Sequence, residues 1–291
     1  VDKQWGVKLT PPLFIDAALR ISRLAESVDE AEIASRAKRY ADESLQAWKD
    51  DFYDDASGMV AEGTQSQLTF GLGLTHMSAA EKEKVFAQLV DNLTAPDDGP
   101  RLSTGIFGTR ILLEELSERG RSDLAYELAT RESFPSWNYM LANGATTLWE
   151  RWQKEDGRYS HNHPMFGSVS AWFYRWLGGI QPADDAVGFD RIHIKPQVVD
   201  GLEWVNTSYD TIRGRIVSNW NKDSEATAHE IIIPPNTHAI VELPLKAGEE
   251  VTESGTGLQK AGCIRILADR SPNTVRMKVG SGHYHFKIAH R

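Results

Sequence analysis

Residues 168–196, SVSAWFYRWLGGIQPADDAVGFDRIHIKP, contain the point at which the sequence changes its hydrophobic period. Before Gly178 and Gly179 the apolar residues recur with helical spacing. After them, residues 190–196 (DRIHIKP) alternate apolar and polar positions, as a half-buried strand does. We therefore predict an α+β chain of two domains, a helical one at residues 1–182 and a β domain at residues 183–291.

The helical part divides into short segments joined by turns. Ser78, followed three residues later by Glu81, is typical of a capping box, and Gly120 stands where a helix C-cap is expected. Short connections between helices favour antiparallel hairpins packed side by side. The apolar spacing predicts helices at residues 13–24, 30–48, 66–74, 79–92, 108–118, 122–128, 142–152 and 168–177.

The second part carries many short alternating segments with turn residues between them, which favours a β-sandwich. The single cysteine, Cys263, excludes an intrachain disulfide, and we expect it to be a small buried residue of a strand. The predicted strands are residues 190–196, 208–210, 214–220, 230–235, 239–244, 274–279 and 283–288.

Composition limits the classes of partner. The formal net charge of −9 argues weakly against a nucleic-acid or anionic-membrane surface, whereas an uncharged sugar would be indifferent to it. No apolar stretch reaches the roughly 20 residues that span a bilayer. The first residues, VDKQWG, lack a signal-peptide pattern and an initiator Met, which suggests a chain that begins inside a longer protein. The compartment stays open: a soluble cytoplasmic, periplasmic or secreted protein fits equally.

The densest group of chemically versatile residues lies between Ser133 and Gly179. Aromatic faces stack on the C–H faces of sugar rings, while carboxylate, imidazole and amide groups bind hydroxyls, so this mixture is typical of a carbohydrate site. The group contains Trp137, Trp149, Glu150, Arg151, Trp152, His161 and His163.

Glu150 can be interpreted in two ways. A glutamate beside an arginine on a helix is most often a surface ion pair. Tryptophans on both sides of Glu150 and Arg151 make a merely solvated charge costly, which favours a functional carboxylate. A general base must stay ionised, and Arg151 would be a suitable partner for that purpose.

His161 and His163 could point the same way and supply two imidazoles to a metal such as zinc. The spacing suggests no third ligand, so we predict neither a metal nor a cofactor. We expect instead that His163 contacts a sugar hydroxyl and that His161 fixes its loop by a hydrogen bond.

The order and spacing of several motifs resemble the α-L-rhamnosidases of glycoside hydrolase family 78, over nearly the whole chain. The motifs are LSTGIFGTR at 102–110, GRSDLAY at 120–126, FPSW at 134–137, GATTLWERW at 144–152, the Asn-His-x-x-x-Gly-Ser-Val pattern at 162–169, GGI at 178–180 and GFDRIHIKP at 188–196.

This resemblance implies a partial (α/α)6 toroid followed by a β-sandwich, and hydrolysis of terminal α-L-rhamnose with inversion. It implies that Glu150 is the catalytic base and that His163 contacts rhamnose. Trp5 is matched to a tryptophan of the rhamnose pocket, and we expect Trp137, Trp149 and Arg151 to complete the substrate contacts.

One departure from the family pattern is important. The family's general acid belongs to an Asp-x-x-x-Arg-x-Glu segment that this sequence lacks, and only about eight of twelve toroid helices are recognisable. We therefore expect the acid in a missing N-terminal part of the same enzyme, which would be this chain's partner. A carbohydrate-binding fragment without activity, or another toroid hydrolase or phosphorylase, remains an alternative, although no phosphate-binding cluster stands out near Glu150.

Overall fold

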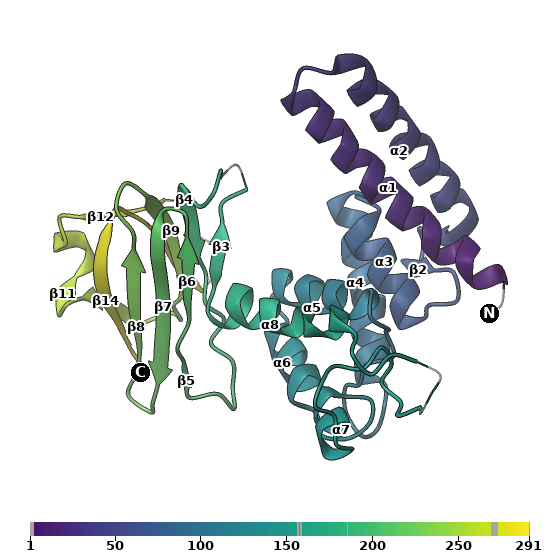
Figure 1. The fold of residues 1–291 in the computed structure, drawn as a ribbon. Helices are drawn as coiled ribbons and strands as arrows, with labels where there is room; N and C mark the ends of the chain where they lie inside the picture. The colour runs from purple at the N-terminus through teal and green to yellow at the C-terminus, as the bar shows by residue number, and fades with distance from the viewer. Residues whose placement is uncertain (1–2, 156, 158, 185, 269–272, 291) are drawn as a thin grey trace. The chain divides into compact units, whose positions relative to one another are not determined.

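The computed structural model describes residues 3–155, 157, 159–184, 186–268 and 273–290, with side chains described from Leu9 onward (Figure 1). Its contacts form two compact units, Val1–Ser168 and Val169–Arg291, which we call the helical unit and the β unit. The predicted domain limits at residues 182 and 183 remain a prediction, because a division by contacts need not coincide with a domain boundary.

The helical unit consists of antiparallel hairpins (Figure 1). Its first hairpin is close-packed because α2 presents the small residues Ala34, Ala37 and Ala41, and the buried Ser22 of α1 donates a 3.0 Å hydrogen bond to the Ala34 carbonyl. A small ladder of β1 (Tyr53–Asp54) and β2 (Met59–Val60) follows it. The helices are α1 (Lys3–Ser27), α2 (Ala31–Phe52), α3 (Gln65–Leu74), α4 (Ala79–Thr94), α5 (Gly108–Glu118), α6 (Ser122–Thr130) and α7 (Trp137–Ala142).

The turns between these helices are fixed by local hydrogen bonds. The predicted capping box at α4 is confirmed, since Ser78 and Glu81 exchange side-chain to backbone bonds, and Thr64 with Gln67 forms another at α3. Gly120 takes the left-handed conformation (φ 76°) that ends α5, as predicted. These caps set where each helix stops and the next one begins.

The predicted helix at residues 142–152 is wrong. α7 ends at Ala142, and Gly144 (φ 84°) turns the chain in the left-handed conformation. The amide of Gly144 bonds the Leu141 carbonyl and that of Ala145 bonds the Met140 carbonyl, which is the Schellman arrangement of a helix end. Glu150 therefore lies in a loop and not on a helix.

The β unit is entered through α8 (Ser168–Trp172) and a π-helical turn, η2 (Phe173–Leu177). The larger sheet has the order β11-β10-β14-β8-β7-β5, with β6 also paired to β7; the smaller has the order β12-β13-β9-β4-β3. The larger sheet contains β5 (Trp204–Val205), β6 (Ser208–Thr211), β7 (Gly214–Lys222), β8 (Ala226–Ile233), β10 (Glu250–Glu253), β11 (Thr256–Gly257) and β14 (Gly282–Ala289).

The smaller sheet contains β3 (Ile180–Pro182), β4 (Arg191–Ile194), β9 (His238–Pro244), β12 (Ile264–Ile266) and β13 (Thr274–Val279). One shared core takes its buried side chains from both sheets, including Ile192 and Val241 from the smaller and Ile231 and Phe286 from the larger. The predicted fold class, helical hairpins followed by a β-sandwich, is confirmed, and a strand forms in each of the seven predicted ranges.

Two further expectations can be compared with the fold. Cys263 is exposed and lies in a turn before β12, so its predicted place as a buried strand residue is wrong. The preceding Ala261 and Gly262 belong to the same solvent-facing connection, which leaves the thiol outside the core. Within the described residues, no helix has both the length and the apolar character needed to span a membrane.

The end of the last helical turn is hydrogen-bonded to the larger sheet. The indole nitrogen of the buried Trp220 donates a 2.8 Å hydrogen bond to the Leu177 carbonyl. A Cβ on Gly178 would lie 2.5 Å from the Thr207 hydroxyl oxygen, so only glycine permits this approach. The helical turn at Phe173–Leu177 is therefore packed as part of the β unit.

Candidate functional site

Two loop segments of the helical unit, residues 148–150 and 160–163, lie side by side. The amide of Glu150 donates to the Ser160 carbonyl at 2.9 Å, and the amide of His163 donates to the Leu148 carbonyl at 2.8 Å. This pair of bonds brings Glu150 and His163, which are thirteen positions apart, into one backbone frame. The frame fixes where both side chains leave the chain.

The Glu150 carboxylate is half-buried and oriented by the backbone of the facing segment. Its Oε2 accepts a 3.1 Å hydrogen bond from the amide of Ser160. In the part of the chain that the structure describes, its Oε1 accepts no hydrogen bond. A carboxylate held on one oxygen and open on the other can accept a proton from a water molecule placed beside it.

Arg151 takes a different direction from the one expected. Its exposed guanidinium stacks over the Tyr159 ring, with the central carbon 3.5 Å from the ring centroid. Among the described residues it forms no ion pair with Glu150. Among the described residues, the amide of Ser160 holds the Glu150 carboxylate, and Arg151 does not.

Trp152, which is buried, and Trp137 form one support of this loop pair. Trp152 donates a 2.8 Å hydrogen bond from its indole nitrogen to the Thr104 carbonyl and lies 3.8 Å from Phe166 between ring centroids. Trp137 is half-buried, meets Trp152 edge to face at 5.0 Å and donates to the Phe166 carbonyl. Trp137 also lines a cavity of about 260 Å³ together with Leu148.

Trp149 and His161 form a second support. Trp149 is buried, and the His161 ring stacks on it with centroids 5.1 Å apart. The Nε2 of His161 has no hydrogen-bond partner among the described residues. Its backbone carbonyl accepts a hydrogen bond from the Thr147 hydroxyl instead. The loop is therefore fixed by stacking and by the backbone.

His163 lies at the start of the short helix η1 (Pro164–Gly167) and is half-buried. Its Nδ1 accepts a 3.4 Å hydrogen bond from the amide of Met165. In the neutral ring this assigns the proton to Nε2, which then acts as a donor. Trp5, the remaining predicted contact, belongs to α1 by its backbone, but its side chain lies outside the described residues.

Two residues of this site were missed from the sequence. Ser160 holds Glu150 through a backbone amide, a role that any residue except proline can fill, so its side chain gave no signal. Tyr159 is the stacking partner of Arg151. Its aromatic ring near a charged cluster was visible in the sequence, but the pairing depends on the loop conformation.

Comparisons with known proteins give both units a family. Residues 11–177 match the bacterial alpha-L-rhamnosidase 6 hairpin glycosidase domain, and residues 179–258 match the bacterial alpha-L-rhamnosidase C-terminal domain. An alpha-L-rhamnosidase of Alteromonas sp. is 33% identical over 216 residues, covering 70% of this chain and 23% of that protein. One of Streptomyces avermitilis is 30% identical over 246 residues, covering 81% and 22%.

Solved structures agree with this assignment. The alpha-L-rhamnosidase from Dictyoglumus thermophilum matches with a TM-score of 0.82 at 29% identity, over 94% of this chain and 31% of that one. The Streptomyces avermitilis alpha-L-rhamnosidase complexed with L-rhamnose matches with a TM-score of 0.83 at 26% identity, over 95% and 26%. The chain thus spans less than a third of the length of these relatives. With its helical hairpins and its β-sandwich both matched, the chain belongs to the bacterial α-L-rhamnosidase family.

Proposed function

We propose that this chain carries the base side of an active site that hydrolyses terminal α-L-rhamnose with inversion, and that Glu150 is the base. The observation that supports the role of Glu150 most directly is the orientation of its carboxylate. The Ser160 amide holds Oε2, while Oε1 accepts no hydrogen bond from the described residues and can accept one from a water molecule. The family membership supports the substrate class.

The chemistry requires two carboxyl groups. Glu150 removes a proton from water as the water oxygen attacks the anomeric carbon, and the glycosidic C–O bond breaks on the opposite face. A general acid gives its proton to the departing oxygen. We expect this acid in a segment that the present 291 residues do not contain, about 6.5–9.5 Å from Glu150, which is the separation that leaves room for the water.

We propose that His163 orients the sugar. The bond from the Met165 amide to Nδ1 leaves an Nε2–H donor that can bind a rhamnose hydroxyl. Trp137 offers its half-buried ring to the apolar face of the sugar, and the buried Trp149 supports the loop. Arg151 and Trp5 are proposed contacts of the bound glycoside at the edge of the site.

The first helix leaves an apolar surface where further helices of the barrel can pack. α1 exposes Leu13, Phe14, Ile21 and Leu24, each at 42% or more of its surface. Burying such side chains against another helix would stabilise the unit by about 1.5–3 kcal/mol for each fully buried side chain. We propose that the missing part of the barrel covers this face and brings the general acid.

The test is made in the complete enzyme that contains this chain. Glu150→Gln keeps the shape of the side chain but cannot take a proton, so kcat on 4-nitrophenyl α-L-rhamnoside should fall about 10²–10⁴-fold. Glu132→Gln, a change of an exposed carboxylate in a neighbouring loop, is the matched control and should leave kcat unchanged.

Two further readouts separate the base from a structural role. Proton NMR of the first-formed product should show β-L-rhamnose, since the attack inverts the anomeric carbon. In Glu150→Ala, added azide should react in place of activated water and restore turnover, with rhamnosyl azide of inverted configuration as product. Full activity of Glu150→Gln, or retention of configuration, would exclude the proposed role.

A further inference from the structure

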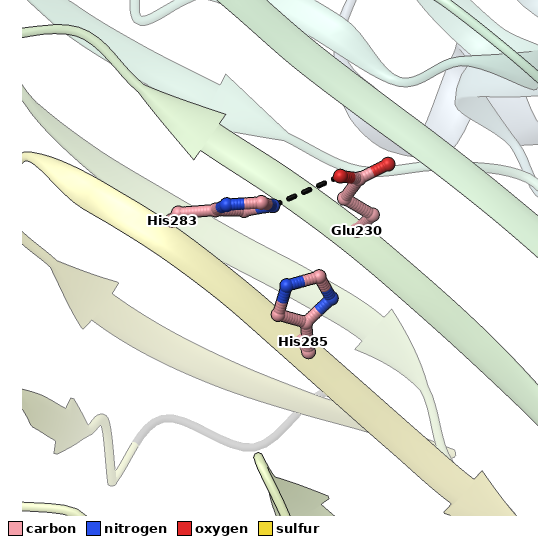
Figure 2. Close-up of side chains that lie close together, drawn as sticks. All are labelled: Glu230, His283 and His285. Atoms are coloured by element: carbon pink, nitrogen blue, oxygen red, sulfur yellow. Dashed lines mark hydrogen bonds and ion pairs between the residues drawn. The ribbon is translucent and has the colours of Figure 1, made fainter.

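A second group of ligand-type side chains lies in the β unit, on the outer face of its larger sheet. His283 and His285 are two residues apart on β14, so the alternation of the strand turns both to the same side. His285 is directly opposite Glu230 of β8 in the antiparallel register. Figure 2 shows both rings projecting toward the Glu230 carboxylate. A hydrogen-bonded strand pair therefore holds all three.

The three side chains are close enough to share one ion. Their candidate ligand atoms all lie within 4.8 Å of one another. His283 Nε2 is 2.9 Å from Glu230 Oε1, and the two imidazole rings are 4.3 Å apart between centroids. Two ligands of a tetrahedral zinc ion, each about 2.1 Å from the metal, are separated by about 3.4 Å. Small side-chain rotations would therefore complete the geometry.

A neighbouring residue orients the carboxylate. Asn219 of β7 donates a 2.8 Å hydrogen bond from its amide nitrogen to Glu230 Oε2. This bond and the contact with His283 hold the pKa of Glu230 below its usual range. Oε1 is left directed at the histidines. Metal ligands in proteins are oriented by hydrogen bonds of this kind.

The donor set selects the class of metal. Two imidazoles with one carboxylate suit zinc and its first-row neighbours, whereas calcium and magnesium prefer oxygen ligands alone. The side chains of His283 and Glu230 are 48% and 39% exposed, so solvent water can supply a fourth ligand. A surface cavity of about 740 Å³ adjoins the cluster, with Glu230 and His285 in its lining.

We propose that Glu230, His283 and His285 form a binding site for a divalent transition metal of the zinc class. The metal replaces the hydrogen bond between His283 and Glu230 and cross-links β8 to β14. The sequence had predicted no metal for this protein. The site lies within the β unit and is independent of the reaction proposed for Glu150.

Binding can be measured on the 291-residue chain without an added affinity tag. Titration with Zn²⁺ by calorimetry should show one saturable site, and Co²⁺ should give the intense visible absorption of a four-coordinate ion. His283→Ala, His285→Ala and Glu230→Gln should each weaken Zn²⁺ binding at least tenfold. Asn219→Ala, which frees the carboxylate from its orienting bond, should weaken it by about tenfold.

Two variants are controls for binding elsewhere. Cys263→Ser removes the exposed thiol, and His76→Ala removes a histidine that is paired with Asp16 in the helical unit. Both should keep the affinity of the parent chain. Circular dichroism of each variant checks the fold, and His285→Gln replaces His285→Ala if the latter unfolds. If the chain shows no saturable Zn²⁺ binding, or if binding survives all three ligand substitutions, the cluster is not a metal site and its residues only form a surface hydrogen bond.

Discussion

The buried His229 makes the stability of the β unit depend on pH. Its side chain is 2% exposed on β8, and neither ring nitrogen has a hydrogen-bond partner among the described residues. Burial lowers its pKa from 6.5 to about 4. The folded state therefore holds the imidazole neutral at a pH where the unfolded chain would protonate it.

The sign and size of the effect follow from linkage. Well above pH 6.5 the imidazole is neutral in both states and contributes no pH dependence. As the pH falls from 6.5 toward 4, only the unfolded state gains the proton, so the free energy of unfolding decreases. Between pH 7.5 and pH 5.0 the loss for this one group is about 2 kcal/mol.

His229→Leu removes the titrating group and should remove this loss. Peptide-resolved hydrogen exchange at a series of urea concentrations measures the unfolding of β7, β8 and β14 apart from the helical unit. The free energy of unfolding of the parent, taken relative to that of the variant, should decrease by about 2 kcal/mol from pH 7.5 to pH 5.0. His238→Leu, a change of a half-buried histidine on β9, serves as the control. Parallel losses in the parent and in His229→Leu would show that burial does not hold this imidazole neutral.

Two further changes test single hydrogen bonds. Trp220→Phe leaves the buried Leu177 carbonyl without its donor, so the urea midpoint of the β unit should fall by an amount that corresponds to about 1–3 kcal/mol, and an unchanged midpoint would contradict this. Ser160→Pro removes the amide that holds Glu150, whereas Ser160→Ala keeps it. In the complete enzyme the proline variant should lose at least tenfold in kcat relative to the alanine variant, and equal rates for the two would exclude a positioning role.

The longer strands could be predicted from the sequence because alternation over several residues marks them without knowledge of their partners. β13 is an example, found at Thr274–Val279 as predicted. β5 and β11 have two residues each, too few for a period, and exist only because β7 and β10 offer them an edge. Such strands depend on tertiary pairing, which the local sequence does not contain.

The loop around Glu150 shows how two local signals can compete. Trp149 and Trp152 have a helical spacing, and that favoured a helix at residues 142–152. Asn143 and Gly144 carry the opposite signal, a helix end, and that signal determines the structure. The tryptophans are buried because the loop folds inward, not because they share a helix face.

Glu150 and His163 were found from the sequence as candidates, but their common frame was not. It depends on two backbone hydrogen bonds between segments ten or more positions apart. The cluster of Glu230 with His283 joins residues that are farther apart in the sequence, since 53 positions separate the two. Only the register between β8 and β14 brings them together. The His-x-His pattern of β14 was the one local sign of it.

The hydrogen bond between Trp220 and the Leu177 carbonyl limits how the hairpin domain and the β-sandwich domain can be exchanged during evolution. The match to the hairpin domain family ends at residue 177, yet the last helical turn of that match is packed within the β unit. A gene rearrangement that joined a foreign hairpin domain at Gly178 would have to recreate the fit of that turn against Thr207. Recombination points that preserve stability are therefore expected before Val169, and the π-helical turn should be inherited with the β-sandwich.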